Sequence, residues 1–528
     1  MLDSGTWSRF YLASPAEERG PVGGGWHVAT AVVDDRELIQ AMRWYDGFVI
    51  AMSNPTFLIT ALGGSVVSLG GWGAIIVWGI SIVMGALHNN IYAELASMFP
   101  KLSGGVAIFG HEAWKRYTTL VGPIAAVGYW IGWSVVLSIS GAIVGYLLQV
   151  QFFSSATWGT HTASLIFGMD FNSNPAIWVG AVVIVAIWVA NVFGIRPAVW
   201  TGYVTAGALC FPLFLTMIAP YITGDFSTSN LHNNIDLGAG WNSGNGLRLV
   251  ITWLYLMCWS SYGFECCATF APEYHDPARD TARALRAAAI FSIFTYILFP
   301  LGAVGAFGDQ NISLDNALTF YAQLWDQLFG HSAANVLVIL LCIGIVLSMN
   351  AATMDGSRAL YGISKDGMTI RWFGKLNRRS VPGNAMTLDA ALNLILLFVA
   401  IGTLAGGGYL RVLAVSNMGY VLSHVFAMSG FLLLRRDRPN AERPIRLGRA
   451  WIAVAAVLLV YDIILIGVGS WSFSETGYPG GASTFVMGVA VLAIALLLYV
   501  YRVKVEDKRP MEWKIKPTPE TDSVGSST

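Results

Sequence analysis

Glu265 is an acidic residue inside a stretch of sequence that is otherwise apolar. It belongs to the run "WSSYGFECC", Trp259–Cys267, within a longer apolar segment from Val250 to Ala271. If that segment crosses a membrane, an ionised carboxylate inside it is costly unless it faces a cavity or a partner. Such residues usually mark a substrate or ion pathway, and a protonated glutamate that only joins two helices is the structural alternative. Glu265 is therefore the first candidate for a binding residue.

Two further residues predict interruptions in helices. Gly263 stands two positions before Glu265, and glycine weakens a helix. Pro55, in "AMSNPTFLI", cannot donate a backbone hydrogen bond, so a second helix is expected to break there, with a simple proline kink as the alternative. Carbonyl groups freed at a break can bind a cation or an ammonium group. Two broken helices at corresponding places in two halves of a chain are typical of an inverted-repeat transporter with a midplane site.

The composition indicates a membrane environment for these residues. Of 528 residues, 55% are hydrophobic and only 12% are charged, which is hard to reconcile with a water-soluble globule. A helix needs about 20 mostly apolar residues to cross a hydrocarbon core about 30 Å thick. We predict an all-α integral membrane protein with twelve transmembrane helices. Their approximate centres are Leu58, Val83, Val135, Val185, Phe211, Met257, Tyr296, Ile343, Leu394, Val421, Leu458 and Val491.

The basic residues indicate the orientation of the chain. Lys and Arg are retained on the cytoplasmic side during insertion. If residues 1–43 lie inside, only Arg248 and Arg411 of the 31 Lys and Arg residues fall outside. This pattern predicts a cytoplasmic N-terminal tail (1–43), a twelve-helix transporter domain (44–502) and a cytoplasmic, partly disordered C-terminal tail (503–528). We expect a multi-pass protein of the plasma membrane, and we see no cleaved secretory signal.

The sequence lacks the motifs of most enzymatic and redox chemistry. All five cysteines lie in predicted helices, where they pack as small apolar side chains. There is no haem motif, zinc-ligand spacing or GxxxxGK[ST] nucleotide loop. We therefore expect neither an enzyme nor a bound cofactor or metal. The expected partners are a small molecule and the lipid bilayer, with no nucleic acid.

Three motifs resemble the amino acid-polyamine-organocation (APC) superfamily. They are "YGFECCATFAPEYHDPARDTARAL" (Tyr262–Leu285), "AELASMFPKLSGG" (Ala93–Gly105) and "SRALYGISKDG" (Ser357–Gly367), which are similar to the passages after helices 6, 2 and 8 of that superfamily. The resemblance covers roughly residues 44–502. It implies a LeuT-type fold, in which helices 1–5 and 6–10 form an inverted repeat, helices 1 and 6 are discontinuous, and helices 11 and 12 are additions. It also implies secondary transport by alternating access.

The same resemblance places the substrate site at the two helix breaks. In relatives, an aromatic side chain six residues before the helix 6 glutamate often closes over the substrate, and Trp259 has that position here. A glycine-serine-glycine run in helix 1 commonly binds a substrate carboxylate through backbone N–H groups, and this chain departs from that run. The expected substrate-binding residues are Ser53, Asn54, Thr56, Trp259, Tyr262, Gly263, Phe264 and Glu265. The residues expected to line the cavity are Tyr129, Trp133, Asn350 and Asn417.

Three functions stay open at this point. The first is a symporter or exchanger of an amino acid, in which the side chains of Ser53, Asn54 or Thr56 replace the missing backbone donors. The second is a transporter of a polyamine, a choline-like compound or another organic amine, held by Glu265 and by the aromatics Trp253, Tyr255, Trp259, Tyr262 and Phe264. The third is a substrate sensor without net transport. The superfamily favours the first, and the missing glycines favour the second.

The coupling ion also stays open between H+ and Na+. Sodium-coupled relatives use hydroxyls on helix 8, but Ser348 and Thr353 are five residues apart and do not match an adjacent pair. Some sodium-independent relatives use a lysine in helix 5, and residues 198–221 contain none. Glu265, Glu273 and His424 are candidate proton carriers, and exchange needs no ion.

Other polar residues in the predicted helices have structural explanations. His88 and Asp462 are expected to form hydrogen bonds between helices rather than to bind a ligand. Arg358 stands near Asp355 at a cytoplasmic helix end, where an inner-gate ion pair and anchoring by the positive-inside rule explain it equally well.

Overall fold

The computed structural model describes residues 38–156, 159–165, 170–241, 246–401, 408–478 and 480–515 of the chain. The chain divides into Met1–Arg36, which lies outside the described residues, and a second unit, Glu37–Thr528, to which every statement below refers. The predicted N-terminal tail therefore lies almost entirely outside the described residues. The same holds for residues 516–528, the end of the predicted C-terminal tail that was expected to be disordered.

The described chain is helical, with one small antiparallel sheet of two strands in which His161 pairs with Ser173. The helices and strands are α1 (Trp44–Ala51), α2 (Asn54–Met98), α3 (Gly105–Trp114), α4 (Val121–Ser134), α5 (Val136–Phe152), β1 (His161–Ser164), β2 (Asp170–Ser173), α6 (Pro175–Val192), α7 (Ile195–Thr223), α8 (Leu247–Tyr262), α9 (Cys266–Thr269), α10 (Pro277–Phe307), α11 (Phe320–Phe329), α12 (His331–Lys365), α13 (Gly383–Leu396), α14 (Gly408–Asp437), α15 (Ala450–Ile464) and α16 (Ala482–Tyr501).

Ten segments of the described chain are long and apolar enough to cross a membrane, so this is a multi-pass membrane protein. The first of them, Trp44–Met98, spans 55 residues and contains a sharp change of direction at Gly70. Gly70 has φ 75°, and a Cβ added there would lie 2.6 Å from the carbonyl oxygen of His232, so only glycine fits. The interrupted helix α8, with 16 residues, is not among the ten. The division into twelve spans stays a prediction.

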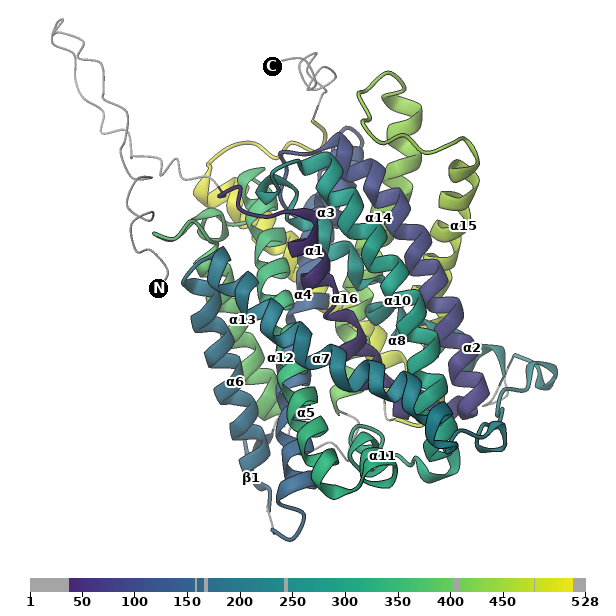
Figure 1. Cartoon of the computed structure of the whole chain (residues 1–528). Coiled ribbons are helices and arrows are strands. Elements are labelled where there is room, and N and C mark those ends of the chain that lie inside the picture. The colour runs from purple at the N-terminus through teal and green to yellow at the C-terminus, as the bar shows by residue number, and fades with distance from the viewer. Residues whose placement is uncertain are drawn as a thin grey trace, which may run out of the picture. The chain divides into compact units, whose positions relative to one another are not determined.

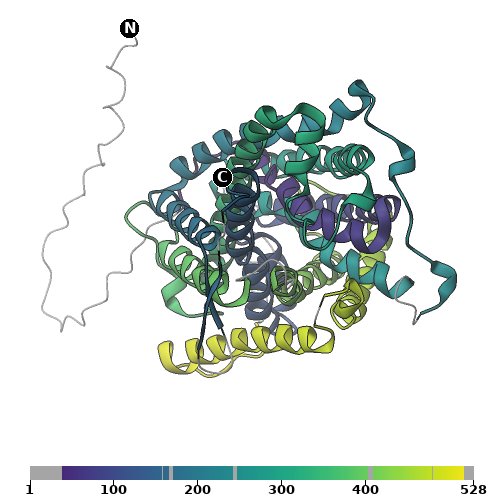
Figure 2. The same ribbon diagram turned by 90° about the horizontal axis from the view of Figure 1, so that it is seen from below.

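The long helices run side by side, with α3 at the opposite end from α11 and β1 (Figure 1). α2 packs against both α8 and α10, while α14 packs against α4. α15 and α16 are peripheral, since most of their apolar side chains face outward, and α16, in yellow, lies at the edge of the bundle (Figure 2). The interrupted helices α1–α2 and α8–α9 are thus surrounded by other helices, which positions their polar residues away from lipid.

Segments that the charge pattern assigns to one side meet at one end of the bundle. The backbone N–H groups of Ala41 and Met42 donate to the carbonyl oxygen of Glu273 at 3.0 and 2.9 Å. On the C-terminal side, the N–H of Ile515 donates to the carbonyl oxygen of Lys115 at 2.8 Å. These contacts place residues next to both predicted tails beside predicted even-numbered connections, while the grouping on one membrane side, and the side itself, stay predictions.

At the other end of the bundle, Asp309 fastens the loop after α7 to the bend in α2. Its carboxylate accepts hydrogen bonds from the N–H of Gly71 at 2.9 Å, the N–H of His232 at 2.6 Å and the His232 ring at 2.8 Å. Burial alone would raise the pKa of Asp309, but these hydrogen bonds outweigh it and hold the pKa below its ordinary value.

We expect Asp309→Asn to lower the free energy of unfolding at neutral pH by about 1.5–3 kcal/mol, because the amide keeps one acceptor for three donors. Since the folded-state pKa is depressed, the stabilisation is present above the ordinary pKa of about 4 and disappears as the pH falls through the folded-state value. Melting midpoints of the purified protein from neutral to acidic pH measure the difference. Asp225→Asn, an exposed change in the same loop, is the control and should leave the midpoint unchanged at every pH. A constant gap between Asp309→Asn and wild type across the pH range would contradict this account.

Candidate functional site

The two predicted helix breaks are both present, and both are tight turns. α1 ends at Ala51, and Met52 and Ser53 keep helical backbone angles, with φ −62° and −64°. The N–H of Ser53 donates to the carbonyl oxygen three residues back, at 3.1 Å, and Pro55 has no N–H to continue the helix. At the second break, α8 ends at Tyr262 and a 3₁₀ turn over Gly263–Glu265 leads into α9.

The two breaks face each other across a close contact. A Cβ added to Gly263 would lie 2.6 Å from the Oδ1 atom of Asn54, so glycine is what allows the two turns to approach. Tyr296, on α10, joins them, because its hydroxyl lies 2.8 Å from the carbonyl oxygen of Asn54 and 3.0 Å from that of Ser260. Sequence analysis missed Tyr296, since a tyrosine in an apolar helix gives no sign of what its hydroxyl contacts.

Glu265 is fully buried and has one satisfied and one free oxygen. Its Oε1 atom accepts hydrogen bonds from the indole N–H of Trp133 at 3.3 Å and from the hydroxyl of Tyr420 at 2.5 Å. Its Oε2 atom has no hydrogen-bond partner among the described residues. Trp133, which was expected to line the cavity, therefore lies beside Glu265, and its place in a substrate cavity stays a prediction. Tyr420 was missed, although it lies three residues after Asn417 and so shares a face of α14 with a predicted residue.

Aromatic side chains lie beside this glutamate. Trp259 packs at a tilt against Phe57, with ring centroids 4.6 Å apart, and Phe57 in turn contacts Trp133 edge-on at 5.7 Å. The indole N–H of Trp259 donates to the carbonyl oxygen of Gly132 at 2.7 Å, which links α8 to α4. Trp259 is 3% exposed, so it is part of a closed aromatic layer next to the breaks. Its role as a gate stays a prediction.

Three buried polar groups at the breaks lack hydrogen-bond partners within the described part of the chain. The hydroxyl of Ser53, both amide atoms of Asn54 and the Oε2 atom of Glu265 form no hydrogen bond with the described residues. All three side chains are fully buried. Buried polar atoms in proteins are nearly always hydrogen-bonded, so a group of free ones at two facing turns calls for an explanation. Together they offer hydrogen-bond donors at the break between α1 and α2 and an acidic acceptor at the break between α8 and α9.

Three other predicted binding residues use their polar groups elsewhere or have none. The hydroxyl of Thr56 donates to the carbonyl oxygen of Ser53 at 2.6 Å. The hydroxyl of Tyr262 donates to Asp462 on α15 at 2.7 Å, so this side chain points away from the breaks. Phe264 packs edge-on against Tyr296, with centroids 6.3 Å apart. Their place at the substrate therefore remains a prediction that rests on position in the chain alone.

The remaining residues of the cavity prediction mostly join helices. Asn350 donates to the carbonyl oxygen of Ala198 at 2.8 Å and accepts from the amide of Asn191 at 2.8 Å. Asn417 donates to the carbonyl oxygen of Tyr255. Tyr129 places its hydroxyl 3.5 Å from that of Thr269, close to the second break. Asparagine side chains in a bilayer readily bind backbone carbonyls, which is what the first two do.

Glu273, a candidate proton carrier, forms an ion pair with Arg358. The guanidinium Nη2 atom of Arg358 lies 3.0 Å from Glu273 Oε2, and its Nε atom donates to the other oxygen. The nearby Asp355, which sequence analysis placed beside Arg358, is not its ion-pair partner among the described residues. Arg358 and Glu273 are 0% and 1% exposed, so this is a buried ion pair.

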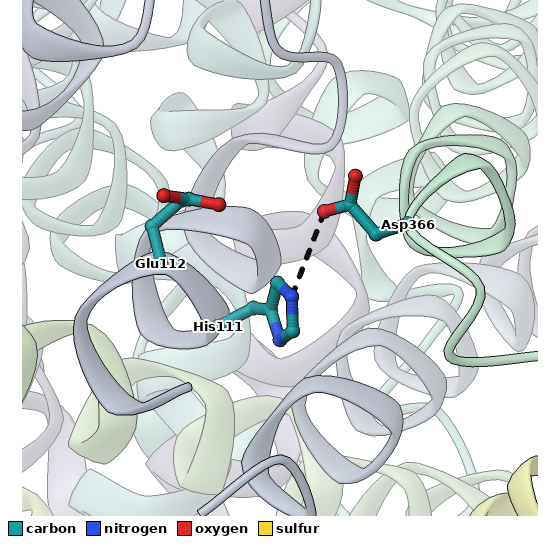
Figure 3. A group of neighbouring side chains, drawn as sticks. All are labelled: His111, Glu112 and Asp366. Atoms are coloured by element: carbon teal, nitrogen blue, oxygen red, sulfur yellow. Dashed lines mark ion pairs between the residues drawn. The ribbon is translucent and has the colours of Figure 1, made fainter. Parts of the chain in front are cut away.

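One group of side chains has the composition of a metal site, at the end of α3. The ligand atoms of His111, Glu112 and Asp366 lie within 4.8 Å of one another, and His111 Nε2 is 3.6 Å from Asp366 Oδ2 (Figure 3). Burial lowers the pKa of His111 to about 4 and raises that of Asp366 to about 6. However, Lys115 and Arg438 already pair with Glu112. Because two cations already pair with the carboxylate of Glu112, we interpret the group as part of an ion-pair cluster rather than as a metal centre.

Comparisons with known proteins identify the relatives of the chain. The model of the amino acid permease family matches residues 43–469. The glutamate/serine transporter AimA of Bacillus subtilis is 24% identical over 473 residues, which cover 83% of each chain. The lysine-specific permease LysP of Escherichia coli is 22% identical over 464 residues, covering 83% of this chain and 88% of the relative. A D-serine/D-alanine/glycine transporter of Escherichia coli is 22% identical over 237 residues, covering 43% of this chain and 50% of the relative.

The matched region contains both helix breaks, Glu265 and the aromatic layer around it. The matches confirm the resemblance to the APC superfamily, which rested on three short motifs, and the family model covers most of residues 44–502, over which that resemblance was expected. This protein belongs to the amino acid permease family.

Proposed function

We propose that this protein is a secondary active transporter that carries an amino acid across the plasma membrane by alternating access. The observation that supports the proposal is the group of free, buried polar atoms of Ser53, Asn54 and Glu265 at two facing helix breaks. A zwitterion is complementary to this group. Its carboxylate accepts from the Ser53 hydroxyl and the Asn54 amide, and its ammonium group donates to Glu265 Oε2.

The relatives support an amino acid as the class of substrate. Their names record transport of glutamate and serine, of lysine, and of D-serine, D-alanine and glycine. These molecules share the α-amino and α-carboxylate groups and differ in side-chain charge. The shared groups are those that the free atoms at the breaks would bind, whereas the side-chain preference depends on the surrounding surface.

The proposed architecture is a LeuT-type inverted repeat of five plus five helices, followed by two more. In it, α1 and the first part of α2 form helix 1, and α8 with α9 forms helix 6, so that each half begins with an interrupted helix. The transporter domain spans residues 44–502, and both tails are cytoplasmic. A closed site between interrupted helices is suited to alternating access, since each half-helix can move about its break.

An organic amine is a weaker candidate for the substrate, because the predicted aromatic cage does not gather at one point. Among its members, Tyr255 donates to the carbonyl oxygen of Ala414 on α14 at 2.5 Å, and Tyr262 donates to α15. Trp259 donates a hydrogen bond to a carbonyl oxygen of α4, and Phe264 packs against Tyr296 of α10. These rings point to four different helices, whereas a quaternary ammonium site needs several rings around one centre.

Counterflow into proteoliposomes tests the proposed function. The purified protein is reconstituted with one unlabelled amino acid inside, and uptake of the same labelled amino acid is competed with a panel that pairs each amino acid with its decarboxylated amine. We expect amino acids to compete and amines to fail, because only the former fill the donors of Ser53 and Asn54. Competition by amines alone would replace the proposal with organic-cation transport, and binding without counterflow would replace it with a sensor.

Gly263→Ala tests the close approach of the two breaks. The new methyl group would lie 2.6 Å from Asn54 Oδ1, so the Asn54 amide has to leave its position. Because Gly263 has φ −51°, which alanine adopts readily, the effect is steric and local. We expect the KM for counterflow to rise about tenfold, equivalent to about 1.4 kcal/mol. Gly79→Ala on α2 is the matched control, since its Cβ would meet nothing within 4 Å, and it should behave as wild type. An unchanged KM in Gly263→Ala would contradict the proposed position of the substrate.

A further inference from the structure

A buried histidine–aspartate pair lies next to the second helix break and takes no part in the site described above. His88, on α2, and Asp462, on α15, are both fully buried, and His88 Nε2 lies 3.0 Å from Asp462 Oδ2. The other ring nitrogen of His88, Nδ1, lies 2.8 Å from the carbonyl oxygen of Met84. Both residues were expected to form interhelical hydrogen bonds, and the contact between His88 and Asp462 confirms that expectation.

The two contacts of His88 determine how many protons the pair holds. A carbonyl oxygen only accepts, so the hydrogen on Nδ1 is committed to Met84. The contact between Nε2 and Asp462 then needs one further proton, which belongs either to the imidazole or to the carboxyl group. Without that proton, a bare nitrogen would face a carboxylate, and the contact would be repulsive. The pair is therefore a site for a single exchangeable proton.

The position of Asp462 is unusual for an acidic residue. α15 is peripheral, and three of its side chains near Asp462 are more than half exposed: Val457, Val460 and Ile463, at 63%, 57% and 52%. Asp462 itself is turned inward and fully buried. An acidic side chain at this depth is costly to maintain and usually marks an ion or proton pathway.

The His88–Asp462 pair is connected directly to the end of α8. The hydroxyl of Tyr262 donates to Asp462 Oδ1 at 2.7 Å, and Tyr262 immediately precedes Gly263 at the break. The Tyr262 ring also packs against His88, with centroids 4.4 Å apart. If the pair loses its proton and separates, Tyr262 loses the contacts that hold the end of α8. A change in proton occupancy therefore acts on the hinge next to the proposed substrate site.

The other titratable groups near the pair come from every helix around it. They are Tyr92 on α2, Cys258 and Tyr262 on α8, His424 on α14 and Tyr461 on α15. The hydroxyl of Tyr92 and the Nδ1 atom of His424 are hydrogen-bonded to each other at 2.5 Å. His424 packs edge-on against Tyr420 at 4.6 Å, and Tyr420 donates to Glu265. A continuous set of polar side chains thus extends from Asp462 towards Glu265.

We propose that the His88–Asp462 pair is the proton-binding site that couples amino acid uptake to a proton gradient. This inference rests on the proposed transport function. One proton from the external water binds the pair, stays there while the substrate is carried, and leaves to the cytoplasmic water when α8 moves and the pair separates. The candidate sodium ligands do not compete with this assignment, because Ser348 and Thr353 lie roughly 140° apart around their helix and each donates to a carbonyl oxygen of that helix.

Two assays on proteoliposomes of wild type, Asp462→Asn and His88→Gln test the proposal. Counterflow at equal pH on both sides needs no proton gradient, and the neutral side chains of both variants resemble the protonated pair, whereas concentrative uptake driven by an acidic exterior requires the proton to bind and leave. We expect both variants to keep counterflow within about twofold of wild type and to lose acid-driven accumulation at least tenfold. Asp389→Asn is the matched control, because Asp389 is a buried acid on α13 that accepts from Trp130 at 3.1 Å, outside the pair.

The outcomes separate this proposal from the proposed function. If no amino acid gives counterflow with wild type, transport itself fails. The proposed proton site is wrong, and the transport function is unaffected, in either of two cases. In the first, wild type gives counterflow but its accumulation of substrate does not depend on the pH gradient. In the second, both variants accumulate substrate as wild type does. If Asp462→Asn does not fold, His88→Gln decides, since it removes the ring nitrogen that shares the exchangeable proton while its amide can still donate to Asp462.

Discussion

Replacement of Glu265 by glutamine is expected to reduce amino acid transport roughly a hundredfold in kcat/KM. The amide can keep its oxygen towards Trp133 and Tyr420, so the contacts that hold the 3₁₀ turn survive. Its nitrogen then replaces Oε2, and a donor faces the substrate ammonium where an acidic acceptor stood. Loss of a charged hydrogen bond in a buried site costs about 3 kcal/mol, which corresponds to the stated factor.

Counterflow kinetics and a melting midpoint, measured on the same preparation, check this prediction. We expect the midpoint of Glu265→Gln to stay close to that of wild type, because the packing is unchanged. Asp389→Asn serves again as the control for neutralising a buried acid, and it should leave counterflow intact. If Glu265→Gln transports with an unchanged KM and an unchanged pH dependence, Glu265 is a structural residue, and the proposed site is wrong.

Replacement of Arg358 by methionine is expected to destabilise the fold by about 3–5 kcal/mol. The change leaves the carboxylate of Glu273 buried without its partner, and it removes the hydrogen bond to the carbonyl oxygen of Met354 and the contact with the Phe270 ring, whose centroid lies 4.8 Å from the guanidinium carbon. The ion pair joins α12 to the turn after α9. A variant that lacks it should therefore unfold at a markedly lower temperature.

The double variant Arg358→Met with Glu273→Leu separates the two causes of this loss. Replacing a buried ion pair by apolar side chains of similar volume is often close to neutral, so we expect the double variant to recover most of the lost stability. Melting midpoints in detergent give both values. Equal stability of Arg358→Met and wild type would show that the pair contributes nothing, and an unrecovered double variant would assign the loss to the other contacts of Arg358.

The sequence allowed the helix breaks to be predicted because their causes are local. Pro55 lacks a donor and Gly263 lacks a side chain wherever they are placed. Glu265 could be singled out for a similar reason, since an acid among apolar neighbours is visible without a structure. The family resemblance placed Trp133 in the cavity, and the structure puts it beside that glutamate.

The partners of the polar residues could not be predicted in the same way. In a membrane helix that is apolar on all sides, the pattern does not show which face a residue occupies. The carbonyl partners of Asn350 and Asn417 were therefore not foreseen, and their place in a cavity stays a prediction. Arg358 finds its partner 85 residues away rather than in the same helical turn. Tyr296 joins two turns from a third helix, a role that depends entirely on tertiary packing.

The central claim is that an amino acid binds between the turns at Ser53–Asn54 and Gly263–Glu265. Ser53→Cys tests it most directly, because the Ser53 hydroxyl has no hydrogen-bond partner in the described part of the chain that the sulfur atom would lose. The rate at which a small, membrane-permeant thiol reagent modifies this cysteine is measured with and without the amino acid that gives counterflow. We predict protection that saturates at the concentration set by the KM, and no protection by the matching amine. Modification at the same rate with saturating substrate, in a variant that still gives counterflow, would contradict the claim.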